Sequence, residues 1–244
     1  MKFSKLILFV LLLNCFARLG AQRFTEQVPH DRKYTVAQAY DPDYGITMYN
    51  KMIQAIGGDL MRFNKSGYNL QGWQEDFYES GKLLHRGFYM DGLIKVFKNY
   101  FESGQVERNF VISDPKRSSV EIYYEDGKVR SQINFFDGNA QKEYDYYPNG
   151  SPEFIEESDK NIEFLYKRNS YYPNGIASSL FELIDKKSKK YIKKEFYESG
   201  KLKEEGEMSF RKDMLDYVKE GEWTYYDEKG AVSKKEKYQR GEKL

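Results

Sequence analysis

Apolar and polar residues alternate after a series of glycines along the chain. After Gly127 the second, sixth and eighth residues are Val129, Ile133 and Phe135, and polar residues fall between them. A period of two is typical of a β-strand with one face more apolar than the other. The fourth residue after the glycine falls on the same face, and it is polar in four copies: His85, Arg108, Ser131 and Glu204. We therefore expect strands that carry a striped face.

The residues before each glycine also recur. They are two aromatic residues followed by two short or turn-prone residues, as in Tyr146-Tyr147-Pro148-Asn149-Gly150. The repeat-turn glycines are Gly81, Gly104, Gly127, Gly150, Gly175, Gly200 and, in a variant copy that begins at Tyr225, Gly230. They are separated by 23, 23, 23, 25, 25 and 30 residues. A nearly fixed period in this range indicates one supersecondary unit repeated along an array.

The residues between the aromatics and the next strand indicate a specific turn. Pro148 fixes φ at the first turn position, Asn149 tolerates the second, and Gly150 can adopt the left-handed third. This predicts a type I turn closed by a glycine bulge, because a two-residue Asn-Gly turn would place Pro148 inside the strand ladder. A second turn is expected half a period later, at Asp91-Gly92, Asp114-Pro115, Asp137-Gly138, Asp159-Lys160 and Arg240-Gly241.

Each repeat is therefore expected to be strand, turn, strand, turn. Adjacent aromatics on a strand point to opposite faces, so both faces gain a ladder of rings from repeat to repeat. The chain holds 22 Tyr, 17 Phe and 2 Trp, yet 32% of its residues are charged. This composition is typical of a sheet with at least one solvent-exposed face. The predicted fold is mainly β: an elongated array of antiparallel β-hairpins in a twisted single-layer sheet over residues 60–244.

The repeated phrase resembles the bacterial variant of the MORN repeat. The resemblance rests on the doubled aromatic, the glycine and the Lys-Leu or Lys-Val that follows, with Gly221-Glu222-Trp223 before one copy and Gly72-Trp73 before another. The resemblance covers about residues 60–244. The family includes proteins labelled YwqK-like antitoxins. The resemblance implies twisted hairpins laid side by side and a binding or scaffold role. Lys186–Lys190 and Arg211–Asp216 are insertions relative to that pattern. Membrane contact is possible, but the sequence does not indicate it.

Residues 1–21 have the features of a secretory signal peptide. Lys2 and Lys5 precede an apolar run, and Leu19-Gly20-Ala21 forms a small-residue cleavage site before Gln22. Lipidation at Cys15 is the alternative, although Asn14 stands where a lipidation motif has a small residue. We expect export and a periplasmic, cell-surface or secreted location. Cleavage after Ala21 leaves 36 basic and 38 acidic residues and no cysteine, which argues against nucleic-acid binding and excludes a disulfide.

Residues 22–59 differ from the repeats. Up to Pro42 they lack a period and are interpreted as an extended linker. Asp43 can then cap a helix that ends at Gly57-Gly58, with one apolar face made of Ile46, Tyr49, Met52, Ile53 and Ile56. We expect this helix to cover the first edge of the sheet, because an open edge invites pairing with another chain.

The sequence predicts no catalytic, cofactor-binding or metal-binding residues, and we expect no enzyme activity. His30 and His85 are isolated, and the carboxylate pairs Glu156-Glu157 and Glu204-Glu205 are interpreted as solvated surface. The candidate contact residues are the first aromatics of four repeats, Tyr100, Tyr123, Tyr146 and Tyr171. The resulting hypothesis is an exported, non-enzymatic module that binds a protein or envelope component. The alternative is an antitoxin or immunity-like protein that neutralises a toxin.

The last strand offers a second possible contact. Its edge around Val232 to Tyr238 has backbone groups available for pairing, and Lys234, Lys235 and Lys237 should discourage aggregation. The expected state of the mature protein alone is a monomer or weak dimer.

Overall fold

The structure is a computed structural model that describes residues 33–34, 40–41, 46–47, 62–64, 66–78 and 80–244. The predicted signal peptide, Cys15 and most of the predicted linker and capping helix lie outside these residues. Two compact units, Met1–Lys95 and Val96–Leu244, divide the chain within one strand, and each is described by itself. Within the described part, no helix is long and apolar enough to cross a membrane.

The first unit contains an antiparallel hairpin of β4 (Gly72–Tyr78) and β5 (Leu83–Met90). The short β1 (Lys33–Tyr34) pairs in parallel with the end of β4, at Phe77 and Tyr78. β2 (Tyr40–Asp41) and β3 (Ile46–Thr47) form a separate two-stranded sheet. Ile46 therefore lies in a strand, which corrects the expectation that it begins the apolar face of a helix; the remaining helix positions other than Thr47 are outside the described residues.

A buried ion pair joins the segment before β4 to that strand. The guanidinium of Arg62 donates to both carboxylate oxygens of Asp76, at 3.1 and 2.6 Å, and both side chains are fully buried. Asp76 is directly opposite His85 of β5, which is also buried. The two parallel hydrogen bonds compensate for the loss of hydration that burial of these charges entails.

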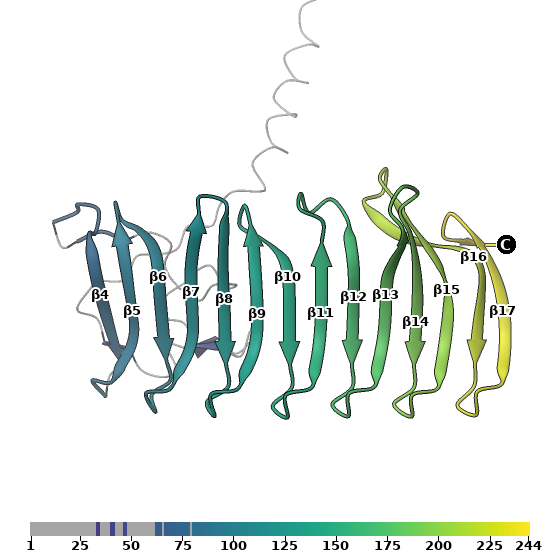
Figure 1. Ribbon diagram of the computed structural model, residues 1–244, viewed down its shortest axis with the longest axis horizontal. Coiled ribbons are helices and arrows are strands. Elements are labelled where there is room, and N and C mark those ends of the chain that lie inside the picture. Colours follow the sequence, from purple (N-terminus) through teal and green to yellow (C-terminus); the bar gives the residue numbers. More distant parts are fainter. Residues whose placement is uncertain (1–32, 35–39, 42–45, 48–61, 65, 79) are drawn as a thin grey trace, which may run out of the picture. The chain divides into compact units, whose positions relative to one another are not determined.

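In the second unit each strand pairs antiparallel with the next one in sequence (Figure 1). The strands are β6 (Leu93–Tyr100, which begins in the first unit), β7 (Val106–Asp114), β8 (Arg117–Tyr123), β9 (Val129–Phe136), β10 (Asn139–Tyr146), β11 (Pro152–Ser158), β12 (Leu165–Tyr171), β13 (Ala177–Asp185), β14 (Lys190–Phe196), β15 (Leu202–Arg211), β16 (Asp216–Tyr226), β17 (Val232–Gln239) and β18 (Glu242–Lys243). The predicted array of antiparallel hairpins in an open sheet is confirmed.

Two kinds of turn alternate along the array. At Pro148-Asn149-Gly150 the Gly150 amide donates to the Tyr147 carbonyl at 2.8 Å, and the Tyr147 amide donates to the Ser151 carbonyl at 2.9 Å. Gly150 has a φ of 87°, so this is a β-turn closed by a left-handed glycine. At the opposite strand ends, Asp137 and Gly138 both have positive φ, of 50° and 78°. Two positive values are typical of the tight type I′ hairpin turn.

The pairing register after each glycine differs at one position from the strict alternation that the sequence predicts. Tyr100 pairs with Val106, but its neighbour Asn99 pairs with Arg108, so Glu107 is an extra, bulged residue. Paired residues share a face and successive residues of a strand alternate, so Val106 and Arg108 lie on opposite faces. The second position after the glycine therefore does not share a face with the fourth, sixth and eighth positions, as the alternation alone suggested.

These pairings define two faces of the second unit. The face that carries the first aromatic of each repeat is called the tyrosine face. The other face carries a series of directly paired, mostly polar residues that crosses the sheet. We call it the polar row: Asn99, Arg108, Ile122, Ser131, Asp145, Phe154, Ser170, Ser179, Glu195, Glu204, Tyr225 and Lys234. Three of the polar fourth positions noted in the sequence thus lie in one row.

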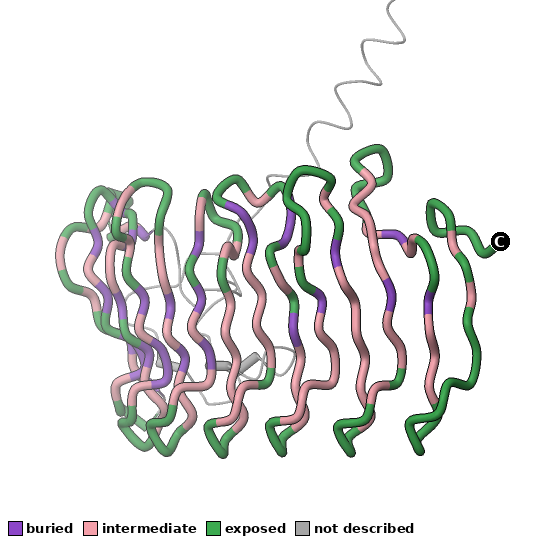
Figure 2. The backbone as a smooth tube through the Cα atoms, turned by 45° about the vertical axis from the view of Figure 1, so that its right-hand side comes forward, coloured by how far each residue is buried: buried purple, intermediate pink, exposed green. Residues whose placement is uncertain are grey.

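Apolar burial is concentrated in two clusters on the face of the polar row. One is the paired series Phe97, Phe110, Val120 and Ile133 on β6 to β9. The other is Phe181, stacked on Tyr191 with ring centroids 4.6 Å apart and packed edge-on against Tyr217. Exposed residues gather in the turns at both ends of the strands (Figure 2). A single layer with local clusters, rather than one thick core, is therefore held together by pairing along the sheet.

Candidate binding surface on the tyrosine face

The first aromatics of the repeats form a regular row on the tyrosine face. Each is the last residue of every second strand of the second unit: Tyr100, Tyr123, Tyr146, Tyr171, Phe196 and Tyr226. Neighbouring strands are about 4.8 Å apart, so successive rings are separated by roughly 10 Å along the sheet. All six side chains are partly exposed. The structure thus brings the four predicted contact tyrosines into one row.

Polar neighbours on the same face hold several of these hydroxyl groups. Tyr123 donates to Glu121 at 2.7 Å, and Tyr226 donates to Glu205 at 2.8 Å. Desolvation, together with the hydrogen bond to Glu121, raises the pKa of Tyr123 to about 12, so its phenol stays protonated at neutral pH. Tyr146 lies 3.5 Å from the amide oxygen of Gln132, at the limit of a hydrogen bond.

Tyr171 differs from its neighbours in the row. Its hydroxyl has no hydrogen-bond partner among the described residues, although its backbone carbonyl is an acceptor. A half-buried tyrosine with an uncommitted hydroxyl offers both a ring edge and a polar group to a partner. Tyr171 is therefore the member of the row best suited to an external contact.

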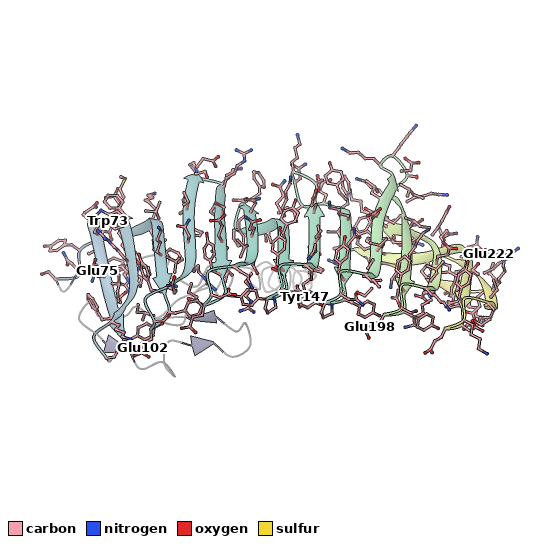
Figure 3. All side chains as sticks on the ribbon, turned by 60° about the horizontal axis from the view of Figure 1, so that its bottom comes forward. Trp73, Glu75, Glu102, Tyr147, Glu198 and Glu222 are labelled. Atoms are coloured by element: carbon pink, nitrogen blue, oxygen red, sulfur yellow. The ribbon has the colours of Figure 1, made fainter. Side chains whose placement is uncertain are left out.

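The second aromatic of each doublet has a structural role that the sequence did not reveal. Tyr124, Tyr147, Tyr172 and Tyr197 each donate a hydrogen bond from the hydroxyl to a backbone carbonyl of the following repeat. The acceptors are the carbonyls of the first aromatics, Tyr146, Tyr171, Phe196 and Tyr226, at 2.7 to 3.0 Å. Figure 3 shows Tyr147 along the edge that also carries the turn residues Glu102 and Glu198. This hydroxyl ladder fixes the spacing of the row of first aromatics.

Side chains in and next to the turns form further hydrogen bonds between repeats at the same edge of the sheet. The side-chain amide of Asn149 donates a hydrogen bond to the Pro173 carbonyl at 2.7 Å. The side-chain amide of Asn174 donates one to the Glu198 carbonyl at 3.4 Å. Lys128 donates to the Pro148 carbonyl at 2.9 Å. Asparagine in the Pro-Asn-Gly turns therefore contributes to contacts between repeats in addition to its tolerance of the turn conformation.

The seventh copy is shifted by one residue relative to the predicted alignment. Asp227 makes the turn contacts that the second aromatic makes elsewhere: its amide donates to the Ala231 carbonyl, and its carbonyl accepts from Gly230. Tyr226, not Tyr225, is thus the first aromatic, and Tyr225 joins the polar row on the other face. Counting back from the glycine, rather than aligning the doublet, would have found this shift.

The acidic residues considered as possible carboxylate pairs are divided between the faces. Glu156 binds Arg168, whereas Glu157 accepts from Tyr144 at 2.7 Å on the tyrosine face. Among the described residues no group of His, Cys, Asp and Glu has the geometry of a metal site. His85 is buried, with its Nε2 3.4 Å from the Tyr89 hydroxyl. These acidic side chains and His85 therefore take part in ion pairs and hydrogen bonds within the sheet.

The outer edge of β17 is only partly covered. β18 pairs with Tyr238 and Gln239, and the Leu244 amide donates to the Lys237 carbonyl at 2.9 Å. Lys235 forms an ion pair with Glu222 of β16 at 2.6 Å. The sequence predicts that the edge around Val232 to Tyr238 is available for pairing. Its Tyr238 end is covered by the chain itself, which leaves the part nearest Val232 for a partner.

Comparison with known proteins supports the repeat assignment. Residues 119–137 and 192–209 match the family described as the MORN repeat variant. Each match covers most of one strand, the turn with its doubled aromatic, and most or all of the strand that follows. No curated protein matches the chain. MORN repeats are generally associated with binding or scaffold roles.

Proposed function

We propose that the chain is an exported, non-enzymatic repeat protein, a binding or scaffold module that contacts a protein or a component of the cell envelope through its tyrosine face. The observation that carries this proposal is the row of partly exposed first aromatics at the end of every second strand. A regular series of amphipathic rings suits an extended partner, because each ring contributes a similar contact. The signal-peptide features of residues 1–21 support the proposed export.

The test compares two variants of the mature chain that begins at Gln22. One replaces Tyr146 and Tyr171 by alanine on the tyrosine face. The matched control replaces Phe154 by alanine in the polar row, where a partly buried ring is lost from the opposite face. Wild-type protein and both variants are immobilised and exposed to an envelope extract, and the recovered partner is then purified and titrated against each of them.

The proposal requires that the partner bind the wild type and the Phe154 variant with similar affinity, and the double tyrosine variant at least about tenfold more weakly. Equal binding to all three proteins, or no specific partner, would overturn it. A captured toxin encoded beside this gene would select the antitoxin alternative. A chain ending at Gly230 adds one comparison: unchanged recovery shows that the β17 edge is not needed.

A further inference from the structure

Three aromatic side chains surround a lysine ammonium group on the face of the polar row. The Nζ atom of Lys219 is 3.8 Å from the ring centroid of Trp223 and 5.2 Å from those of Tyr225 and Tyr238. All three distances are within the reach of a cation–π interaction. We call Trp223, Tyr225 and Tyr238 the aromatic cage; β16 provides the first two and β17 the third.

The cage is held by contacts that do not involve Lys219. Trp223 is fully buried and lies on Gly206 of β15, where a Cβ atom would come within 2.3 Å of the indole ring. Its Nε1–H donates to the Glu207 carbonyl at 3.0 Å. The hydroxyls of Tyr225 and Tyr238 are 3.2 Å apart, and Tyr238 donates to Glu236 at 2.7 Å. The walls are thus held by contacts within the sheet and not by the cation alone, which lowers the cost of binding one.

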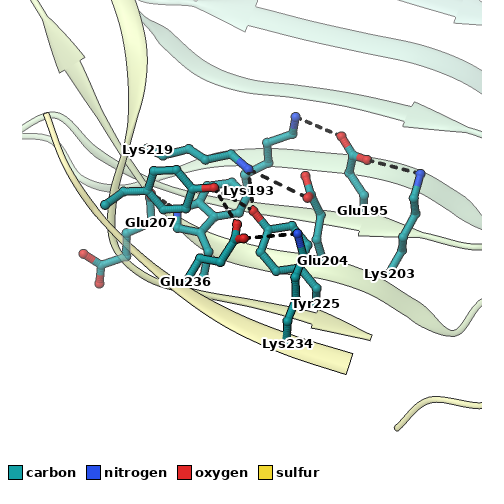
Figure 4. A network of polar contacts seen from close by, with 11 residues as sticks. Lys193, Glu195, Lys203, Glu204, Glu207, Lys219, Tyr225, Lys234 and Glu236 are labelled. Atoms are coloured by element: carbon teal, nitrogen blue, oxygen red, sulfur yellow. Dashed lines mark hydrogen bonds and ion pairs between the residues drawn. The ribbon is translucent and has the colours of Figure 1, made fainter. Parts of the chain in front are cut away.

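Negative charge lies beside the cage. Glu204 has Oε2 3.8 Å from the Nζ atom of Lys219, and its side chain is 16% exposed. Figure 4 shows Lys219 between Glu204 and Tyr225, with Glu236 nearby. Glu236 is already paired with Lys234 and Lys243, at 3.2 and 2.7 Å. Glu204 is therefore the carboxylate available to a cation in the cage.

The cage offers a primary ammonium group few hydrogen-bond acceptors. An ammonium group carries three N–H donors, but in the described part of the chain only the Tyr225 hydroxyl, at 3.0 Å, is within hydrogen-bond distance of this one. A quaternary ammonium group has no N–H donor to satisfy, and its methyl groups can contact the ring faces directly. The Lys219 side chain is 29% exposed, so it has a route out of the cage.

We propose that the aromatic cage is a binding site for a trimethylammonium group and that Lys219 is its displaceable internal occupant. The ligand class is a choline-type cation, free or as a lipid headgroup. The site is on the face opposite the row of first aromatics, so this proposal does not depend on the proposed function. Loss of binding at one face leaves the other open to measurement.

Tryptophan fluorescence gives a direct readout of the cage. The chain has two tryptophans, so a Trp73→Phe background leaves Trp223 as the only indole reporter. Choline chloride is titrated at constant ionic strength, with the neutral carbon analogue 3,3-dimethylbutan-1-ol as the control ligand. We expect a saturable change with choline alone, and about tenfold tighter binding after Lys219→Met removes the competing charge. No saturable change in either protein, or an equal response to the neutral analogue, would overturn the proposal.

A second pair of variants tests the role of charge. Glu204→Gln should weaken choline binding roughly fivefold in the Lys219→Met background, because the nearest negative charge is lost. Glu222→Gln is the matched control, since Glu222 lies on the opposite face and pairs with Lys235. Thermal melts verify that each variant is folded. If both glutamine variants bind equally, the cage is not acting as an electrostatic cation site.

Vesicles distinguish the two sources of the ligand. The Lys219→Met protein is sedimented with vesicles of phosphatidylcholine and, separately, of phosphatidylglycerol, which lacks the trimethylammonium group. Selective sedimentation with phosphatidylcholine supports a lipid headgroup as the ligand, and choline binding without sedimentation supports a soluble cation. Failure to bind either choline or phosphatidylcholine would overturn the proposal.

Discussion

The hydroxyl group of Tyr147 donates a hydrogen bond to the backbone carbonyl of Tyr171, 2.8 Å away in the next repeat. The two residues are 24 positions apart, and the same relationship recurs between Tyr172 and Phe196 at 2.9 Å. A side chain of one repeat thus holds the backbone from which the next first aromatic projects. This contact links the stability of the array to the geometry of the candidate binding surface.

Removal of the Tyr147 hydroxyl should lower the stability of the protein. Tyr147→Phe keeps the ring but loses one hydrogen bond to a partly buried carbonyl, at a cost of about 1 kcal/mol. For a domain of this size the melting temperature should fall by about 2–4 °C. Tyr171→Phe is the control, because its hydroxyl has no partner among the described residues. An equal fall in both variants would show that the ladder does not contribute.

Substitution of a turn glycine should be costly through the backbone alone. Gly127 has a φ of 83°, and a Cβ atom placed there would meet no atom within 4 Å. Gly127→Val should therefore destabilise the fold by about 1–2 kcal/mol, since a β-branched residue adopts the left-handed region at a steric cost. Gly127→Asn should cost less, because asparagine tolerates this region. Urea denaturation of the two variants measures the difference, and equal midpoints would contradict this explanation.

The sequence was sufficient for the strands and turns of the repeats but not for the faces of the sheet. The period of Gly104, Gly127 and Gly150 predicts the hairpins, because turn chemistry and alternation are local properties. The bulge at Glu107 is set by pairing between strands, and alternation within one strand cannot reveal it. The cage around Lys219 likewise depends on which residues of β15, β16 and β17 become neighbours. The sequence marked its Trp223 only as part of a repeat motif.

The contact between Trp223 and Gly206 can be tested directly. A Cβ atom at position 206 would lie 2.3 Å from the indole, closer than any real contact, so the ring must move. Gly206→Ala should destabilise the protein by about 1–3 kcal/mol and change the fluorescence of Trp223. In a double-mutant cycle, Trp223→Ala should remove most of the cost of the alanine. Additive effects would show that the two residues are not coupled.

Stability should also depend on the titration of Glu143. Desolvation, with the nearby charges of Asp145 and Glu156, raises the pKa of Glu143 from 4.5 to about 7. The folded state therefore holds this proton more tightly than the unfolded chain does. The contribution to stability is fully present below about pH 4.5 and is lost as the pH rises through 7. Urea denaturation between pH 5 and 8 should show a flatter profile for Glu143→Gln than for wild type, and identical profiles would contradict this prediction.

Removal of one whole repeat should leave a folded protein. Deletion of residues 105–127 takes out β7 and β8 and joins Gly104 to Lys128, so β6 meets β9, which has the same direction as β7. Ser131 then replaces Arg108 opposite Asn99, and Ile133 replaces Phe110 opposite Phe97, which preserves the polar row and the apolar pairing. Deletion of residues 105–115 instead removes β7 alone and brings β8 beside β6, which runs in the same direction and cannot form the antiparallel pair through a short turn. Circular dichroism and thermal melting should show a cooperative transition for the longer deletion and its loss for the shorter one; equal behaviour of the two proteins would show that the repeat has been assigned the wrong phase.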